Sequence, residues 1–467
     1  MYNIDFFLNQ IMEKKQFKII QSYFENHAHS HHQIQGWEVF IKNILQDIIS
    51  ESQWINEHDE NFATGTVEIV VGSNDQQQKH IISFLDVTVW PPNVKESNGE
   101  VRDVTPFECR IRKMTYSNPV TCNVTHEVTF RNEEGEEKKN IRRYQDMPIC
   151  RLPAMVGVKY NDCNQPERNE CLFDEGGYFI INGLERVLTS QLKLRVNTLF
   201  VFPGKSPGKY SFVAEIRSLH STKYRSTSTL KIGVTVTKKE ATGIAVLVPF
   251  LQKTPTTPLT LGLQTIFTLM DVPYEQAVAM ICPDDWPVEC RDLVVQSLRS
   301  DMLAHMTKEE VLIWIGKNGT NEPTRNKQER YVFHIFQNET LPHIGMDQAP
   351  DTLHKKAFFI AYMVRKVVNV HFGLERPSDR DHNMNKKLDG PGPLMAVLFR
   401  QIYRKFLRNF KQTLTKALES KKTLVCINDY IIASRITSHM SYHFATGNWS
   451  LQKGKLYVSV FFFLCLC

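Results

Sequence analysis

The hydrophobic period changes several times along this chain, and these changes restrict its fold more than any other feature. Apolar residues recur at three- and four-residue intervals in the first fifty residues, near 355–371 and at 397–418. This spacing predicts amphipathic helices. Within 66–130 and 196–250 the apolar residues alternate or form short runs, which predicts strands. Blocks of strands beside blocks of helices indicate an α+β fold with antiparallel sheets and packed helices.

Two turns punctuate the strand-rich parts. Asn182-Gly183 separates two apolar runs in DEGGYFIINGLERVLTS (174–190), which predicts a β-hairpin whose turn residues adopt positive φ. Gly176-Gly177 marks a second bend, and its spacing fits neither a P-loop nor a dinucleotide loop. A charged run at 131–140 follows alternating apolar residues and predicts another hairpin with a solvated tip.

From residue 250 the pattern turns helical through Ile315. Thr307 and Glu310 form a capping box that begins one helix, and Gly316 is placed to end it. The helix near 355–371 is expected to carry an apolar stripe that includes Phe358, Tyr362, Val364, Val368 and His371.

Composition leaves the function open. The chain has 467 residues, a net charge of +6 and an isoelectric point near 8.6, which permits contact with nucleic acid without requiring it. Its 10 cysteines contain no C-x-x-C pair. Bridges between Cys163 and Cys171 or between Cys282 and Cys290 are one alternative. We favour reduced thiols, because the first residues lack the pattern of a secretion signal.

Two groups of residues have side chains suited to bind a metal. The first is a histidine cluster, which we interpret as a solvated connector because no acidic or cysteine ligand is near in sequence; its members are His27, His29, His31 and His32. The second is Asp379, Asp381 and His382 in RPSDRDHNMNKKLDGPGPL (376–394). For this one we favour a loop that joins two domains through salt bridges and side-chain caps.

One amphipathic helix carries a basic face. Its apolar positions recur every fourth residue: Leu398, Ile402, Phe406, Phe410, Leu414 and Leu418. Its basic residues are Arg400, Arg404, Arg408, Lys411 and Lys416, with Lys421-Lys422 beyond. Such a face can follow a phosphate backbone, and a merely solvated face is the alternative. The candidate nucleic-acid-binding residues are Arg400, Arg404, Arg408, Lys411 and Lys453.

Several motifs, taken together, resemble one family. In chain order they are HHQIQGWEVFI (31–41), TPFECRIRKMTYSNPV (105–120), MPICRLPAMVG (147–157), DEGGYFIINGLERVL (174–188), AEIRS (214–218), LPHIG (341–345), DRDHNMNKKLDGPGPL (379–394) and FATGNW (444–449). This order resembles the second-largest subunit of archaeal, eukaryotic and viral multisubunit DNA-directed RNA polymerases. The resemblance runs from about residue 20 to about residue 453.

The resemblance implies an architecture. Residues 1–195 and 375–450 would form a protrusion domain that enters the fork, and 196–374 a lobe inserted into it. Together they would form one wall of the DNA cleft used in transcription. The segment after 375 would be a structural junction, which implies a positioning role for Arg380, Asp381, His382, Lys386, Lys387 and Asp389.

The chain also departs from the family. The family continues NKKLD with alanine-glycine-proline-leucine, whereas this chain has Gly390-Pro391-Gly392-Pro393-Leu394, and the extra proline should alter only the helix start. Residues 454–467, GKLYVSVFFFLCLC, resemble nothing in the family. This apolar tail is too short to span a bilayer. We interpret the chain as the N-terminal part of the subunit, with an aberrant end from a retained intron, a frameshift or a split gene.

The resemblance implies a subunit of a nucleotidyltransferase whose reacting groups lie outside this chain. No residue here matches them, so no catalytic residue and no metal ligand is assigned. Magnesium and zinc are expected only in the complete polymerase. The implied partners are the other polymerase subunits, especially the largest one, and the DNA template, with no membrane. The implied location is the nucleus, or the cytoplasm for a cytoplasmic viral enzyme. A truncated product without activity (non-functional or dominant-negative) and a standalone DNA-binding module remain alternatives.

Overall fold

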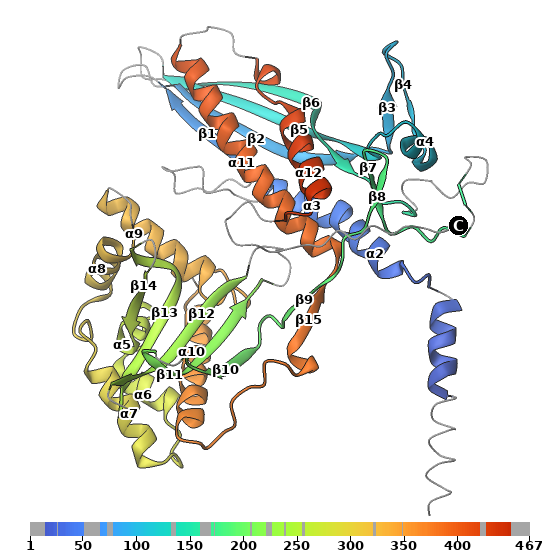
Figure 1. The fold of residues 1–467 in the computed structure, drawn as a ribbon. Coiled ribbons are helices and arrows are strands. Elements are labelled where there is room, and N and C mark those ends of the chain that lie inside the picture. The colour runs from blue at the N-terminus through green and yellow to red at the C-terminus, as the bar shows by residue number, and fades with distance from the viewer. Residues whose placement is uncertain are drawn as a thin grey trace, which may run out of the picture. The chain divides into compact units, whose positions relative to one another are not determined.

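The computed structural model describes fourteen stretches of the chain: 15–25, 27–50, 66–71, 78–131, 137–158, 170–171, 173–205, 208–220, 227–237, 240–254, 257–320, 324–347, 349–420 and 426–449. The chain forms two compact units (Figure 1). Unit 1 comprises Met1–Gln191 with Asp389–Cys467, and unit 2 comprises Leu192–Leu388. The predicted domain boundaries were 195 and 374, whereas unit 1 ends at Gln191 and resumes at Asp389. Residues 192–195 and 375–388 therefore belong with unit 2. The predicted helix before residue 15 and the tail lie outside the described residues.

Unit 1 contains a four-stranded antiparallel sheet in the order β1-β2-β5-β6. The sheet strands are β1 (Thr66–Val71), β2 (Gln78–Val89), β5 (Ser117–Arg131) and β6 (Glu137–Pro153). Two small hairpins add β3 (Asn93–Lys95) to β4 (Val101–Asp103), and β7 (Phe179–Ile181) to β8 (Leu184–Arg186). The helices are α2 (His31–Val39), η1 (Phe40–Ile44), α3 (Leu45–Ser50), α4 (Pro106–Ile111), α11 (Pro391–Glu419), η6 (Ile427–Asp429) and α12 (Ala433–Thr446). Residues 15–25 are also helical.

Helix α11 packs on the sheet through the apolar stripe that its sequence predicts. Alternate residues of β2 are buried, Ile82 and Phe84 among them. The Phe84 ring lies 6.3 Å from that of Tyr403 and 6.0 Å from that of Phe410, centroid to centroid. Burying large aromatic rings contributes much of a core's stability, so this sheet and this helix form the centre of unit 1.

The predicted hairpin at Asn182-Gly183 is confirmed. Asn182 has φ 51° and Gly183 has φ 78°, and they connect β7 to β8 in antiparallel pairing. Phe179, on β7, packs its ring 5.1 Å from Trp37 of α2 and 4.9 Å from Phe444 of α12. The hairpin therefore joins α2, near the start of unit 1, to α12, near its end.

Unit 2 contains a five-stranded antiparallel sheet in the order β10-β11-β12-β13-β14. Its strands are β10 (Leu199–Pro203), β11 (Tyr210–Ser218), β12 (Ser228–Thr237), β13 (Glu240–Thr254) and β14 (Thr257–Gly262). The helices are α5 (Leu263–Leu269), α6 (Tyr274–Ile281), α7 (Val288–Arg299), α8 (Lys308–Gly319), α9 (Arg325–His334), η4 (Ile335–Glu339) and α10 (Pro350–His371). The short strands β9 (Gln191–Leu194) and β15 (Lys386–Asp389), the latter preceded by η5 (Asn383–Asn385), pair where the chain enters and leaves this unit.

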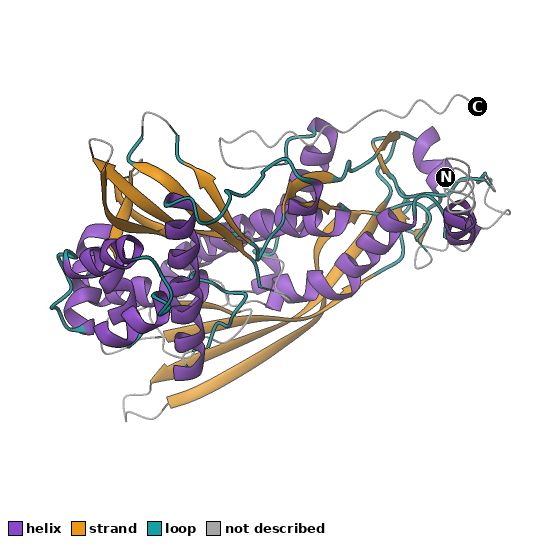
Figure 2. Cartoon of the chain, turned by 90° about the horizontal axis from the view of Figure 1, so that it is seen from below, coloured by secondary structure: helices purple, strands orange, loops and turns teal. Residues whose placement is uncertain are grey.

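The helices of unit 2 cover one face of its sheet (Figure 2). In β11, Ala214 and Ile216 are fully buried in the shared core, whereas Glu215 and Arg217 alternate with them on the other face. The apolar residues that alternate in the sequence of this strand are therefore the ones whose side chains are buried. With antiparallel sheets packed against helices in both units, the predicted α+β class is confirmed.

Three local predictions for unit 2 were wrong. Strand β14 lies where helix was expected, because its residues extend the sheet along β13. Helix α8 begins with the predicted capping box but continues past Gly316 to Gly319. A Cβ on Gly316 would lie 3.0 Å from Cβ of Gln328, so this glycine serves helix packing and not helix termination. In α10, Phe358 and Tyr362 are 60% and 40% exposed, so they lie outside the buried stripe.

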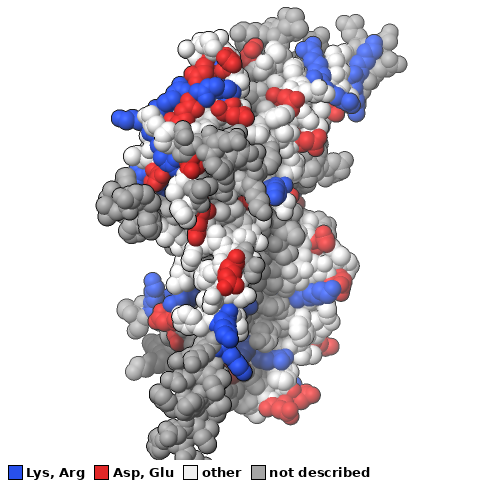
Figure 3. Space-filling view, turned by 90° about the vertical axis from the view of Figure 1, so that its right-hand side faces the viewer, with Lys and Arg blue, Asp and Glu red and all other residues white. Residues whose placement is uncertain are grey.

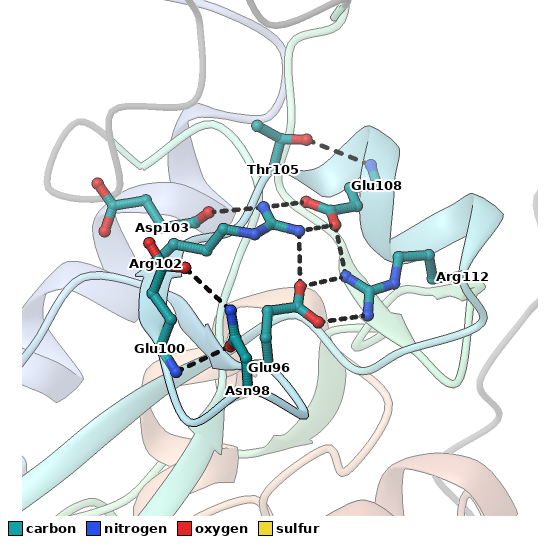
Figure 4. A network of polar contacts seen from close by, with 8 residues as sticks. All are labelled: Glu96, Asn98, Glu100, Arg102, Asp103, Thr105, Glu108 and Arg112. Carbon is teal, nitrogen blue, oxygen red and sulfur yellow. Dashed lines mark hydrogen bonds and ion pairs between the residues drawn. The ribbon is translucent and has the colours of Figure 1, made fainter.

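A cluster of ion pairs stabilises the region around α4 (Figure 4). Arg102 contacts Glu96 at 2.8 Å and also contacts Glu108, while Arg112 lies 2.7 Å from each of the same two carboxylates. Arg102 and then Arg112 lower the pKa of Glu108 to about 2. Thr105 accepts a hydrogen bond from the backbone of Glu108, which caps the helix. The cluster fixes the β3–β4 hairpin against α4.

Candidate nucleic-acid interface

The basic face predicted on α11 is exposed only in part. Arg404 and Arg408 are exposed and Lys411 is half-buried. Lys405, which the sequence reasoning passed over, is exposed and lies 3.0 Å from Nε2 of His439 on α12. Lys416, near the C-terminal end of α11, is also exposed. Long cationic side chains at helical spacing can reach successive phosphates, so the usable face runs from Arg404 to Lys416.

Arg400 does not belong to that face, which corrects the prediction. Its side chain is only 5% exposed. Burial, and then the charge of Arg404, lowers the pKa of its guanidinium to about 10, while Asp47 of α3 acts in the opposite direction. Arg400 therefore stays charged at neutral pH and faces the α3 side of the core. A buried cation near a carboxylate positions helices and does not reach a ligand.

Other predicted contributors fall outside the part of the chain that the structure describes. They are Lys453 and the pair Lys421-Lys422. Figure 3 shows one face of the molecule, on which basic and acidic side chains of the described residues lie next to one another. Charge is therefore mixed on that face, and the candidate residues for a nucleic-acid contact are those of α11.

The segment 376–389 forms a loop that its own side chains cap. Asp379 Oδ1 accepts a hydrogen bond from the backbone of Asp381 at 2.9 Å, and His382 Nδ1 accepts one from Met384 at 3.2 Å. Arg380, which is exposed, holds its guanidinium 4.1 Å from the centre of the Phe202 ring. These contacts use the side chains as turn and helix caps, and the role of the segment as a junction between domains stays a prediction.

The end of this segment is strand β15, which pairs with β9. Lys386 and Lys387 lie in β15 and are half-buried, and Asp389, which ends it, is 7% exposed. The backbone of Arg195 donates a hydrogen bond to the carbonyl of Asn385 at 2.8 Å. Of the predicted junction residues, Arg380, Asp381 and His382 are thus exposed, and the other three belong to the pairing of β15 with β9.

The histidine cluster has an acidic partner that the sequence alone did not reveal. His29 Nδ1 lies 3.0 Å from Oε1 of Glu175, and the Ser30 hydroxyl donates to the Glu175 carbonyl at 2.7 Å. His29 lowers the pKa of Glu175. Glu175 precedes the Gly176-Gly177 bend, whose two residues have φ 71° and 86°. Because Glu175 lies far from His29 in the sequence, no pattern of neighbouring residues could have predicted this contact.

A second histidine pair is buried in the sheet of unit 1. Nδ1 of His80 on β2 lies 3.0 Å from Nε2 of His126 on β5, and both residues are 5% exposed. Burial lowers the pKa of both rings; for His126, His80 and Arg142 add to the effect and bring the pKa to about 4. Both are therefore neutral at physiological pH and share one hydrogen bond.

The motifs that carry the family resemblance meet in space within each unit. In unit 1, Trp449 of FATGNW donates to the carbonyl of Leu394 at 2.8 Å, and Gly447 ends α12 in the left-handed conformation. In unit 2, Ser218 of AEIRS and His343 of LPHIG lie 2.7 Å apart, hydroxyl to Nδ1. In each unit, residues of one motif therefore hold residues of another in place.

Tyr116 links three motifs of unit 1. Its side chain is fully buried. Its backbone N–H donates to Ile180 at 3.0 Å, and its carbonyl accepts from Ala154 at 2.8 Å. These bonds join TPFECRIRKMTYSNPV to DEGGYFIINGLERVL and to MPICRLPAMVG.

The structure also bears on the expected reduced thiols and on the expected absence of a membrane contact, within the described residues. Cys282 and Cys290 are buried free thiols, and Cys163 lies outside the described part of the chain. None of the described helices combines the length and apolar character needed to cross a membrane.

Comparison with known proteins agrees with the motifs. The family model "RNA polymerase beta subunit" matches residues 29–438. DNA-directed RNA polymerase II subunit 2 of Arabidopsis thaliana is 30% identical over 457 residues, which cover 94% of this chain and 37% of that protein. DNA-directed RNA polymerase II subunit RPB2 of Encephalitozoon cuniculi is 31% identical over 446 residues, with 93% and 36% covered.

An archaeal relative is closer to this chain in length. DNA-directed RNA polymerase subunit Rpo2N of Methanocaldococcus jannaschii is 26% identical over 439 residues, which cover 92% of this chain and 80% of that protein. The chain spans only about a third of the polymerase II relatives named above. It belongs to the RNA polymerase beta subunit family, of which it represents the N-terminal region of the second-largest subunit.

Proposed function

We propose that this chain forms part of one wall of the DNA cleft in a DNA-directed RNA polymerase, with unit 1 as the protrusion and unit 2 as the lobe. It serves transcription as a scaffold that contacts the DNA backbone through α11. Its partners are the other polymerase subunits, above all the largest one, and the DNA template. The enzyme to which it belongs is a nucleotidyltransferase, and this chain contributes no catalytic residue.

The observation that carries this proposal is the family match over residues 29–438, together with the exposed cations Arg404 and Arg408 on α11. Their guanidinium groups are suited to pair with phosphate oxygens, and phosphate contacts position a protein without specifying sequence. A wall of a cleft through which every template passes needs this kind of contact. The location follows the polymerase: nucleus for a cellular enzyme, cytoplasm for a cytoplasmic viral one.

The proposal is tested by salt-dependent binding of the full chain to a short labelled DNA duplex. Arg404→Glu with Arg408→Glu should weaken binding and reduce the slope of log K against log salt by about 2, because two phosphate contacts are lost. Fluorescence anisotropy over a range of salt concentrations measures both quantities.

A matched control is Arg291→Glu with Lys317→Glu, which makes the same change in net charge at exposed positions of α7 and α8. If this control lowers the slope as much as the α11 variant, the attraction is a property of net charge and the α11 contact is wrong. Arg400 is left unchanged, because a carboxylate at a buried position would destabilise the fold.

Two other functions make different predictions. A standalone DNA-binding module would bind the duplex tightly by itself and would not join a polymerase. A truncated product without activity would fail to assemble with the other subunits. Co-purification of the tagged chain with the largest subunit from the source cells separates both from the proposal.

A further inference from the structure

Unit 2 contains a large pocket among its helices, and no step of the proposed function uses it. The pocket has a volume of about 580 Å³, which is in the range of pockets that hold ligands. Its floor and walls are mainly apolar, formed by Leu269 and Met270 at the end of α5, Leu312 of α8, Phe336 of η4 and Leu353 of α10. All its lining residues belong to unit 2.

A buried lysine holds one wall of the pocket in place. Lys356 of α10 is fully buried, and its Nζ donates to the carbonyls of Gln337 at 2.8 Å and Phe336 at 3.3 Å. Gln337 in turn donates from Nε2 to the carbonyl of Met346 at 3.0 Å. Phe336 and Gln337 line the pocket. Because hydrogen bonds to a buried ammonium are costly to break, this wall is fixed before any ligand arrives.

The rim of the pocket is acidic. Three carboxylates, Asp271, Asp347 and Asp351, line it together with one ammonium, Lys308. Lys308 pairs with Asp271 at 2.5 Å. Lys355, outside the pocket, pairs with Asp351 at 2.5 Å. Asp347 is exposed and forms no ion pair with another described residue, although burial lowers the pKa of Lys356 and the charge of Asp347 acts to raise it. The rim therefore offers at least one carboxylate to an incoming cation.

One wall residue is accessible from solvent. Phe333, on α9, lines the pocket and is 41% exposed. An exposed aromatic ring beside a mainly apolar pocket of this volume is typical of a site that holds a side chain of another protein. A rim of carboxylates selects partners with positive charge near that side chain.

We propose that this pocket binds a peptide segment of a partner protein through one large apolar side chain, flanked by a lysine or arginine that pairs with Asp347. The apolar side chain fills the space between Leu312, Phe336 and Leu353. This inference is independent of the DNA contact proposed for α11, because no lining residue lies in unit 1.

The test uses random peptides displayed on phage and selected on the immobilised full chain, followed by anisotropy with the synthesised peptides. The enriched peptides should carry a large apolar residue close to a lysine or arginine. Leu312→Trp, which fills the pocket, should weaken their binding at least about tenfold. Asp347→Lys should weaken it by about fivefold at low salt and less at high salt.

Matched controls are Val288→Trp and Asp292→Lys, which place the same side chains at exposed positions of α7 outside the pocket. Both should leave the affinity unchanged. The proposal is wrong if no peptide is enriched, if enriched peptides bind Leu312→Trp equally well, or if Asp347→Lys has no effect. It is also wrong if tryptophan amide alone binds as tightly as the peptides, because the pocket would then be a small-molecule site.

Discussion

The buried histidines show how a single residue sets a condition for stability. His80 and His126 are neutral in the folded protein, and the folded-state pKa of His126 is about 4 against 6.5 for an unperturbed ring. Between these two values the unfolded chain binds more protons than the folded one. The free energy of unfolding therefore falls as the pH falls from 6.5 to 4, by about 3 kcal/mol from His126.

This prediction is checked by urea unfolding at several pH values between 7 and 4. His80→Phe with His126→Phe removes both rings and should make this dependence less steep. The remaining slope comes from other histidines whose pKa values burial also lowers, namely His343, His371 and His443. His32→Gln changes an exposed histidine and should leave the dependence as it is. An unchanged slope in the double variant would show that the protein titrates elsewhere in this range. Glu108 becomes relevant only below 4.5, because its pKa in the folded state is about 2.

Residues governed by their neighbours in sequence were predictable, and those governed by distant contacts were not. The Asn182-Gly183 turn and the capping box of Thr307 and Glu310 depend on a few adjacent residues, so the sequence contains the whole signal. Arg400 resembles Arg404 in sequence, yet it faces Asp47 of α3 and is buried. Nothing local distinguishes the two arginines.

At the scale of elements, the crossing of α2 and α11 depends on two glycines. A Cβ on Gly392 would lie 2.5 Å from the carbonyl oxygen of Gly36, and one on Gly36 would lie 3.3 Å from Cγ of Pro391. The unusual Gly390-Pro391-Gly392 start of α11 therefore does more than begin a helix. It lets the two helix backbones approach closely.

This contact predicts the sign of a stability change. By helix propensity alone, Gly392→Ala should stabilise the protein by about 1 kcal/mol. The overpacked crossing should reverse this and destabilise it by about 1 to 3 kcal/mol. Chemical unfolding measures the difference. Gly390→Ala is the control, since a Cβ there has nothing within 4 Å. A gain in stability from Gly392→Ala would mean that the helices separate without cost.

Helices and strands were predictable where the spacing of apolar residues along the sequence matches the spacing of the buried side chains. Helix α11 has its apolar stripe from Leu398 to Leu414 buried as spaced. In α10 the stripe is rotated, because Ala357, Ile360 and Ala361 pack inward and leave Phe358 and Tyr362 exposed. Alanines in the buried face of a helix weaken the hydrophobic periodicity of its sequence. Large aromatic residues outside that face make the sequence predict the wrong face as buried.

The whole molecule consists of two units, each with its own core. In unit 1 the aromatic residues of β2 and α11 pack together, and in unit 2 one continuous apolar cluster joins the sheet to its helices. Units with separate cores commonly unfold as separate cooperative steps. We therefore expect this chain to unfold in two transitions, which two core variants should shift one at a time.

Phe84→Ala removes a ring from the core of unit 1 and Ile232→Ala a side chain from that of unit 2, where both residues are almost fully buried. Each should cost about 2 to 5 kcal/mol and lower the midpoint of one transition only. Differential scanning calorimetry or urea unfolding of the full chain measures the midpoints. If the two transitions coincide in the unchanged protein, each variant should separate them. Unit 1 should then unfold first in Phe84→Ala, and unit 2 should unfold first in Ile232→Ala. A single transition that both variants shift equally would show that the units fold as one, and the inserted unit would then be a structural extension of the first.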